Sequence, residues 1–271
     1  MSSGTSANTN TNANTSAGHR DFAGRSVIVT GAGSGIGRAG ALAFAERGAK
    51  VVVADLNAES AAKVTAEIEQ GGGAAVTVVG DLSEQSVVDR VTATAVETFG
   101  RIDVLVNNAG IMDTMSATAD VTDAEWERLI RINLTAPFLL TRAVVPHMLE
   151  AGSGAIVFTA SEAALRGSAA GAAYTVSKHG IVGLTKNLAI TYRRHGIRTN
   201  AIAPGGTITN IRLDVDWDAL GPQALRPYMA ANVGEPAAAE TQAAAIVFLA
   251  SDAAANINGA ILPVDNGWSA V

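Results

Sequence analysis

The stretch "SVIVTGAGSGIGRAGALAFAERG" (residues 26–48) joins a β-branched run, a glycine-rich turn and an Ala-rich helical segment. Gly31, Gly35 and Gly37 would permit a tight turn that brings the backbone close to a pyrophosphate, while the N-terminus of the following helix would offer amides to that anion. The strict six-residue fingerprint fails at Ile36, so the turn alone also fits a simple tight loop. Its place directly after a strand favours nucleotide binding at the start of a parallel α/β sheet.

Six more apolar runs follow, and Ala-rich helical segments lie between most of them. The runs are "KVVVAD" (50–55), "AVTVVGD" (75–81), "DVLVNNAG" (103–110), "AIVFTAS" (155–161), "RTNAIAPG" (198–205) and "GAILPVDNG" (259–267). Nearly continuous apolar runs are typical of strands buried on both faces, and their alternation with helices implies right-handed crossovers. The sequence therefore predicts a doubly wound α/β fold with about seven mostly parallel strands, helices on both faces and a ligand crevice at the carboxyl ends of the strands.

The composition narrows the possible partners. The 271 residues are 48% apolar and 16% charged, the net charge is −6, and Lys and Arg are scattered along the chain. Because nucleic acids and anionic membranes select a basic patch, we expect a small-molecule partner instead, with no nucleic acid and no membrane. The absence of cysteine excludes disulfides, thiolate metal sites and cysteine nucleophiles, and the four histidines lack metal-ligand spacing, so no metal is expected.

A low-complexity tract precedes the predicted domain. Residues 1–21 are rich in Ser, Thr, Asn, Ala and Gly, so we expect a disordered leader, and we expect residues 22–271 to form a single domain. The N-terminus lacks the apolar core of a signal peptide, and no apolar run approaches the length that spans a bilayer. A cytoplasmic protein is therefore expected.

The second predicted strand ends in a carboxylate, Asp55. It follows Gly37 by 18 residues, where an acidic side chain accepts hydrogen bonds from an adenosine ribose. The carboxylate would also repel a 2′-phosphate by about 1 kcal/mol at about 4 Å in water, and by more where it is partly buried. No basic residue follows in "ADLNAES", and Ser34 in the glycine turn is neutral. NAD is therefore expected and NADP disfavoured, with capping of the next helix as the alternative role of Asp55.

A phenol and an ammonium share one helical face in "YTVSK" (174–178). A free tyrosine has a pKa of about 10, which is too high for efficient proton exchange at neutral pH. Since residues four apart are neighbours on a helix, the Lys178 ammonium would approach Tyr174 and lower its pKa. The pair suggests a general acid and base, although this spacing alone also fits a coincidence on a helix surface.

Five motifs occur in a characteristic order along the chain. They are "TGAGSGIG" (30–37), "NNAG" (107–110), Ser161 thirteen residues before Tyr174, the Tyr174 and Lys178 pair, and "PGGTIT" (204–209). Together they resemble the classical short-chain dehydrogenases/reductases, and the resemblance covers about residues 22–271. It implies a Rossmann-like fold, an NAD-dependent oxidoreductase that interconverts a secondary alcohol and a ketone, and a homotetramer.

The resemblance also implies roles for individual residues. Tyr174 would exchange the proton, Ser161 would hydrogen-bond the substrate oxygen, and Lys178 would hold the nicotinamide ribose. Asn133 would support a water in a proton relay, which is compatible with a buried Asn satisfied by helix backbone, and Ser177 is a weaker candidate than Ser161. The expected NAD-binding residues are Gly31, Ser34, Gly35, Ile36, Gly37, Asp55, Asp81, Leu82, Asn107, Ala109, Gly110, Tyr174, Lys178, Pro204, Gly205, Thr207 and Thr209.

Several of these positions carry a specific expectation from the resemblance. Asp81 would approach the adenine and Asn107 the two riboses. The turn at 204–205 would lie beside the nicotinamide, and Thr209 would contact the carboxamide or the pyrophosphate. Thr207 departs from the branched apolar residue that is usual in the family, which leaves its backbone contact intact and its local packing open.

The substrate side of the site rests on fewer motifs. Residues 210–236 interrupt the rhythm of strands and helices, so the segment of about 207–236 would form a substrate lid or, alternatively, a subunit contact. Trp217 and Tyr228 would line a pocket there or simply pack. The expected substrate residues are Met112, Ala163 and Gly206, followed by Asp113, Met115, Glu162 and Arg166. Pairing with solvent is the simpler account of the last two.

Two alternative functions stay open. A 3-oxoacyl-(acyl-carrier-protein) reductase-like enzyme would need a basic docking patch near the pocket, for which "YRRHGIR" (192–198) is a hint. A non-catalytic NAD-sensing protein would keep the glycine turn, yet it has no need for Ser161, Tyr174 and Lys178 at these spacings.

Overall fold

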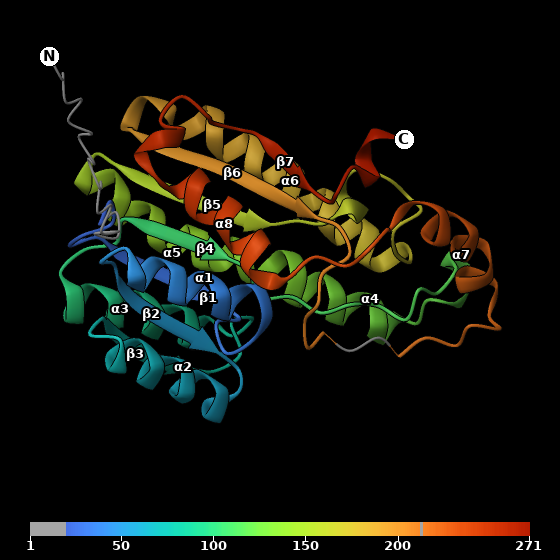
Figure 1. Ribbon diagram of the computed structural model, residues 1–271, viewed down its shortest axis with the longest axis horizontal. Coiled ribbons are helices and arrows are strands. Elements are labelled where there is room, and N and C mark those ends of the chain that lie inside the picture. Colours follow the sequence, from blue (N-terminus) through green and yellow to red (C-terminus); the bar gives the residue numbers. More distant parts are fainter. Residues whose placement is uncertain (1–19, 212–213) are drawn as a thin grey trace, which may run out of the picture.

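The computed structural model describes residues 20–211 and 214–271 (Figure 1). The expected leader, residues 1–21, lies outside the described residues except for its last two positions. The strands are β1 (Ser26–Thr30), β2 (Lys50–Asp55), β3 (Ala74–Val79), β4 (Val104–Asn107), β5 (Gly154–Thr159), β6 (Ile197–Pro204) and β7 (Ile261–Val264). The α-helices are α1 (Gly35–Glu46), α2 (Ala58–Gln70), α3 (Gln85–Phe99), α4 (Asp123–Ile130), α5 (Ala136–Ala151), α6 (Ala172–Tyr192), α7 (Leu220–Asn232) and α8 (Ala239–Ala250).

The seven strands form one parallel sheet in the order β3-β2-β1-β4-β5-β6-β7. The chain builds outward from β1 to β3 and then crosses back to β4, so the order reverses between β1 and β4. In open α/β sheets the ligand crevice lies at the carboxyl ends of the strands at such a switch point. The predicted doubly wound fold is therefore confirmed, and the glycine turn after β1 lies at this crevice together with "NAG" after β4.

Helices cover both faces of the sheet, because successive strand residues point to opposite sides. On one face Ile28, Leu105 and Ile156 pack with side chains of α3, α5 and α6. On the other face Val27 and Val104 pack with side chains of α1, α2 and α8, and α1 lies beside α8 there (Figure 1). Burial on both faces explains why the strands are almost continuously apolar.

Some strands end earlier than the apolar runs that predicted them. The strands β1 and β2 have the predicted bounds, whereas β4 ends at Asn107 and β5 at Thr159. The residues after these ends leave the hydrogen-bonded ladder and form loops at the crevice. The motif residues of "NAG" and Ser161 are therefore loop residues.

One helical run is long and apolar enough to cross a membrane by length and composition. It comprises α4, a π-helical turn at Arg131–Thr135 and α5, and extends over 29 residues from Asp123 to Ala151. This finding corrects the expectation that no apolar run approaches such a length. Its buried side chains, among them Leu140 and Met148, belong to the core on one face of the sheet, so core packing accounts for its apolar character.

Candidate active site

The glycine turn lies against the loop that follows β4. A Cβ at Gly31 would come within 2.9 Å of Ala109 Cα, and one at Gly37 would come within 2.1 Å of the Gly31 carbonyl oxygen. Gly31 and Gly35 also have the left-handed φ angles 61° and 50°. Glycine is therefore required for this conformation and this packing. The turn places the first residues of α1 at the carboxyl end of β1, an arrangement that suits a pyrophosphate.

Asp55 lies beside this turn at the end of β2. Its Oδ2 accepts a hydrogen bond from the Gly33 amide at 2.8 Å, and its Oδ1 accepts one from the Asn57 amide at 2.8 Å. The following helix, α2, is capped by Asn57, whose side chain accepts from the Ser60 amide. The alternative capping role thus falls to Asn57, and the Asp55 carboxylate lies at the glycine turn, where a dinucleotide's adenosine ribose binds in such folds.

Two residues outside the predicted set hold the glycine turn and the β4 loop together. The Thr30 hydroxyl accepts hydrogen bonds from the amides of Asn108 at 2.9 Å and Ala109 at 3.0 Å, and it donates to the Val106 carbonyl at 3.3 Å. The Asn108 side chain donates to the Thr30 carbonyl at 3.1 Å. These bonds join the two sides of the crevice. The polar residue that ends β1 and the doubled Asn of "NNAG" are the sequence signals that point to them.

Ser161, Tyr174 and Lys178 converge where β5 ends and α6 begins. The Lys178 Nζ lies 5.4 Å from the centroid of the Tyr174 ring and donates a hydrogen bond to the Thr159 carbonyl at 2.9 Å. The Ser161 side chain lies close enough to Tyr174 to affect its pKa, and its Oγ accepts from the Ala163 amide at 3.1 Å. Tyr174 and Lys178 are 7% and 4% exposed, and Ser161 is half-buried. The three predicted side chains therefore form one cluster.

Burial dominates the proton affinities of this cluster. It raises the pKa of Tyr174 to about 12, which the nearby Ser161 side chain offsets only in part and the Asp113 carboxylate reinforces. Burial also lowers the pKa of Lys178 to about 8. The expected approach of the two side chains is observed, but the expected lowering of the Tyr174 pKa is outweighed by desolvation in the protein alone.

Asn133 lies in the π-helical turn Arg131–Thr135 between α4 and α5. Its side chain pairs with both backbone groups of Ile111, accepting from the amide at 2.9 Å and donating to the carbonyl at 2.9 Å. A Cβ at Gly110 would lie 3.2 Å from Asn133 Oδ1 and 3.5 Å from Lys178 Nζ, so both side chains flank the same glycine. The backbone that satisfies Asn133 is therefore that of the β4 loop and not of a helix, as had been the alternative.

Ser177, the weaker serine candidate, is engaged elsewhere. It is fully buried, its hydroxyl donates to the Tyr174 carbonyl at 2.7 Å, and it accepts from Asn133 Nδ2 at 3.3 Å. Its hydroxyl therefore serves the backbone of α6 and the orientation of Asn133.

The positions expected near the adenosine have partners within the protein. Asp81 accepts a hydrogen bond from the Ser83 amide at 2.9 Å and lies 3.6 Å from the Arg131 guanidinium; the Ser83 amide is the main cause that lowers the Asp81 pKa. The Asn107 side chain is buried and donates to Thr141 of α5 at 3.0 Å. Leu82 is partly buried and packs against the core. Their contacts with adenine and ribose stay predictions.

The turn after β6 reaches both the loop after β7 and the glycine turn. A Cβ at Gly205 would lie 2.8 Å from Asp265 Cα, and one at Gly35 would lie 3.2 Å from Thr209 Cβ. The Thr207 hydroxyl donates to the Gly205 carbonyl at 3.0 Å, and Thr207 takes part in an isolated parallel bridge. The polar side chain at position 207 is thus satisfied within the turn, which answers the open question of its packing.

An apolar cluster surrounds Tyr174. Met112 and Val233 pack against it, and a Cβ at Gly206 would lie 2.8 Å from Val233 Cγ1. The buried members of the cluster are Leu129, Ala163, Ala169, Ala170, Ala173, Tyr174 and Trp268. The three expected substrate residues therefore lie in or beside one apolar cluster at the predicted catalytic tyrosine.

Glu162, directly after Ser161, is fully buried and does not pair with solvent, which corrects the simpler expectation. Its carboxyl lies 2.9 Å from the Arg166 guanidinium, and the nearby Asp265 carboxyl acts on its pKa. Burial and then Asp265 raise the pKa of Glu162 to about 7, against the opposing effect of Arg166. Asp265 in turn accepts from the amides of Gly267 at 3.0 Å and Ser269 at 2.6 Å. This network ties the segment after Ser161 to the C-terminal turn.

Asp113 and Met115, the other pocket candidates, are buried in the loop after β4. They are 3% and 1% exposed, and Met115 has a left-handed φ of 59°. Asp113 accepts hydrogen bonds from backbone amides at the start of α6. Both side chains are therefore too buried to line an open pocket, and Asp113 supports the site by binding the start of α6.

The expected lid contains α7. A Cβ at Gly221 would lie 2.1 Å from the Met115 carbonyl oxygen, so the start of α7 packs on the loop after β4. Trp217 and Tyr228 are 46% and 58% exposed, and Trp217, Arg226, Met229 and Ala230 line a cavity of about 510 Å³. Residues 212–213 of the expected lid lie outside the described residues. Closure over a substrate and contact with another subunit both stay predictions for this segment.

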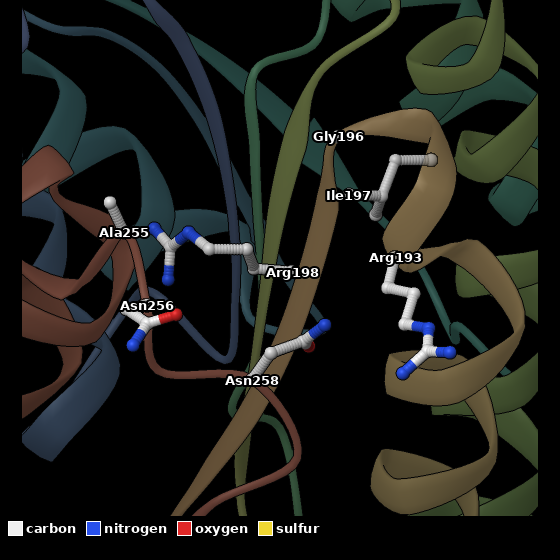
Figure 2. A pocket seen from close by; sticks show the side chains of 7 residues that line it. All are labelled: Arg193, Gly196, Ile197, Arg198, Ala255, Asn256 and Asn258. Atoms are coloured by element: carbon white, nitrogen blue, oxygen red, sulfur yellow. The ribbon is translucent and has the colours of Figure 1, made fainter.

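A second cavity, of about 490 Å³, lies at the opposite end of β6 (Figure 2). Arg193 and Asn258 line it, while the Arg198 guanidinium donates to carbonyls at the end of α8. Arg193 directly follows α6, which is 21 residues long, so it lies about 30 Å along the helix from Tyr174. The basic cluster at 192–198 therefore cannot form a docking patch next to Tyr174.

Comparisons with known proteins agree with this geometry. The family model for short chain dehydrogenases matches residues 25–218. A 3beta-hydroxysteroid dehydrogenase 2 from Eggerthella lenta is 41% identical over 250 residues, which cover 92% of this chain and 96% of the relative. A cis-4-hydroxycyclohexanecarboxylate dehydrogenase from Sinomonas cyclohexanicum is 42% identical over 252 residues, which cover 92% of this chain and 98% of the relative.

Solved structures match over the same span. A levodione reductase aligns with a TM-score of 0.84 at 37% identity and covers 92% of this chain and 99% of its own. A putative NAD(P)-dependent gluconate 5-dehydrogenase from Beutenbergia cavernae, with bound NADP at low occupancy, aligns with a TM-score of 0.80 at 38% identity and covers 94% of this chain and all of its own.

Proposed function

Because the chain belongs to the short-chain dehydrogenase family, whose relatives here act on alcohols and ketones, we propose that it is an NAD-dependent oxidoreductase with Tyr174 as general acid and base. The reaction interconverts a secondary alcohol and a ketone. One observation carries the proposal: Ser161, Tyr174 and Lys178 form a single cluster at the carboxyl end of β5, in which Tyr174 and Lys178 are buried.

The proton chemistry follows from the three side chains. In the oxidative direction Tyr174 takes the hydroxyl proton of the alcohol, and in the reverse direction it returns a proton to the ketone oxygen. Ser161, which lies close enough to the phenol to affect its pKa, orients the substrate oxygen beside it. With a pKa of about 8, Lys178 is mostly protonated at pH 7, so its charge favours the phenolate. When bound, the nicotinamide supplies the hydride acceptor or donor.

The proton then has an internal route away from Tyr174. Lys178 and Asn133 flank Gly110 at 3.5 Å and 3.2 Å from a Cβ built there, and Asn133 is held by the Ile111 backbone. We propose that Asn133 holds the relay group that links Lys178 to solvent.

Because burial keeps Tyr174 protonated at neutral pH, the phenol is ready to donate, and alcohol oxidation should accelerate as the pH rises.

The glycine turn fits a dinucleotide, because Gly31 and Gly37 leave no room for a Cβ between the turn and its neighbours. The proposal of NAD over NADP rests on Asp55, whose carboxylate is held at the turn by the Gly33 amide. A negative charge there disfavours a 2′-phosphate. A family neighbour holds NADP, so cofactor choice is a property to be measured on this chain.

The substrate we propose is a neutral or weakly polar cyclic secondary alcohol or its ketone. The walls around Tyr174 are apolar and include Met112, Ala163 and Trp268. The named substrates of two relatives, a 3beta-hydroxysteroid and a cis-4-hydroxycyclohexanecarboxylate, carry a hydroxyl on an alicyclic ring. An apolar enclosure binds such rings through burial of their surface.

The deciding experiment measures initial rates of NADH formation with a panel of cyclic and acyclic secondary alcohols for the wild-type protein and Tyr174→Phe. We expect turnover with a cyclic alcohol in the wild type, and a loss of at least about a hundredfold in the variant with unchanged NAD binding. Tyr192→Phe is the matched control, because it makes the same change at the far end of α6. Turnover by Tyr174→Phe at the wild-type rate would refute the assignment.

We also propose a homotetramer located in the cytoplasm. Apolar side chains on the outer faces of three helices support the assembly, since Phe138, Val176 and Phe248 are 43%, 46% and 41% exposed. Light scattering after gel filtration measures the number of subunits, and a monomer would contradict the proposal.

A further inference from the structure

The first turn of α6 lacks a cap of its own. Its N-cap residue is Gly171, which has no side chain, and no side-chain hydrogen bond from this position closes the helix end. The first amides of a helix have no partner within the helix, so an uncapped first turn frays. Tyr174, on which the proposed function rests, is the third residue of α6.

A carboxylate from another part of the chain supplies the missing cap. Asp113 Oδ2 accepts a hydrogen bond from the Tyr174 amide at 3.1 Å, and Asp113 Oδ1 accepts from the Gly171 amide at 3.3 Å and the Met115 amide at 3.1 Å. The carboxylate is 3% exposed. A negative charge at a helix N-terminus is favoured by the helix dipole, and three amide donors share the burden of its desolvation.

The packing around Asp113 leaves little freedom. A Cβ at Gly171 would lie 2.6 Å from Asp113 Oδ2, so only glycine admits the carboxylate at this point. The next residue, Thr114, is tied to α4, because its amide and hydroxyl donate to Glu125 at 3.0 Å and 2.8 Å. The loop after β4 therefore holds Asp113 in place, and Asp113 holds the start of α6.

We propose that Asp113 is a positioning residue for the proton exchange. Its carboxylate clamps the helical turn that carries Tyr174 to the loop after β4. The proposal rests on the proposed function of Tyr174, and it adds a residue that acts through Tyr174 and not on the substrate. The clamp also joins the two walls of the site, because the same loop begins with Gly110 and Ile111 beside Asn133.

The charge of Asp113 gives the clamp a signature that a purely structural residue lacks. The Asp113 carboxylate raises the pKa of Tyr174. Two other charged groups act here: Lys178 on α6, whose Nζ lies over the Tyr174 ring, and Glu125 on α4, whose charge raises the pKa of Asp113. Removal of the Asp113 charge therefore shifts the titration of Tyr174 to lower pH, while loss of the clamp lowers the rate.

The test compares Asp113→Asn with Asp120→Asn, which removes the same charge from an exposed position farther along this segment. Asn has the same shape as Asp, but its NH2 group replaces one of the two oxygens that accept hydrogen bonds from the backbone amides. We expect kcat of Asp113→Asn to fall by about tenfold to about a hundredfold with KM for NAD unchanged. We expect the pH profile of alcohol oxidation to shift to lower pH, and the control to show neither effect.

Hydrogen exchange of the peptide at 170–178 supplies a readout besides activity. We expect faster exchange at the start of α6 in Asp113→Asn and unchanged exchange in the control. A lower kcat with an unmoved pH profile, or an unchanged exchange rate, would overturn the inference. If Tyr174→Phe keeps its turnover, the proposed function fails, while the exchange measurement still decides whether Asp113 clamps α6.

Discussion

Replacing Glu162 by Gln should make the protein more stable above neutral pH. Glu162 is fully buried between Arg166 and the Asp265 carboxyl, and its pKa is raised from 4.5 to about 7. Between these two values the folded protein binds a proton that the unfolded chain releases. Stability therefore falls as the pH rises through this window, and the full loss is present above pH 7. A Gln at this position does not titrate.

The size of the effect follows from the two pKa values. Their difference of about 2.5 corresponds to about 3 kcal/mol at about 1.4 kcal/mol per pKa unit. Between pH 5 and pH 8 the wild-type protein should lose about 2 to 3 kcal/mol through this one carboxyl. A loss of this size is a large fraction of the stability of a typical domain.

Urea unfolding at several pH values and one fixed protein concentration measures the effect. We expect the free energy of unfolding of Glu162→Gln, relative to wild type, to rise by about 2 to 3 kcal/mol from pH 5 to pH 8. Glu69→Gln is the control, because Glu69 is an exposed residue at the end of α2. If the wild-type and Glu162→Gln curves stay parallel across this range, the reasoning about the buried carboxyl pair is refuted.

Two further predictions concern the dinucleotide site. Asp55→Asn should raise the ratio of kcat/KM for NADP to that for NAD by at least about tenfold, because a repulsion of about 1 to 4 kcal/mol is removed, and an unchanged ratio would contradict the role of Asp55. Gly37→Ala should weaken NAD binding by at least about tenfold and destabilise the fold by about 1 to 3 kcal/mol, because its Cβ would lie 2.1 Å from the Gly31 carbonyl oxygen. Gly40→Ala on the same helix is the control, since nothing lies within 4 Å of a Cβ built there, and this substitution should stabilise the fold by up to about 1 kcal/mol. NAD affinity is measured by titration for both variants, and equal effects on it would contradict the packing argument.

The fold could be predicted because its signal is local. The apolar runs at β1 and β2 have the strand bounds that the sequence predicts, and the glycine turn between β1 and α1 stands in one unbroken stretch. The cluster of Ser161, Tyr174 and Lys178 could be predicted too, because their spacing is a property of the sequence itself. Their convergence in space follows once the strands are parallel.

The supporting contacts could not be predicted, because they join segments that are distant in sequence. Asp113 meets α6 58 residues later, and Glu162 meets Asp265 across most of the C-terminal half. From the sequence alone Glu162 has solvent as its simplest partner, and Asp113 is a candidate for the substrate pocket. The rise of the Tyr174 pKa through burial could not be predicted for a similar reason, since desolvation depends on the whole surrounding core.

The π-helical turn at Arg131–Thr135 limits how far this enzyme can be redesigned toward regular helices. Each residue of an α-helix turns the chain by about 100°, since a turn takes about 3.6 residues. Deleting one residue to merge α4 and α5 would swing Asn133, relative to one of these helices, away from the Ile111 backbone that it pairs with. A consensus design that idealises this segment would gain a smoother helix and lose the amide that borders Lys178. Variants engineered for thermal stability should therefore keep the π-helical turn.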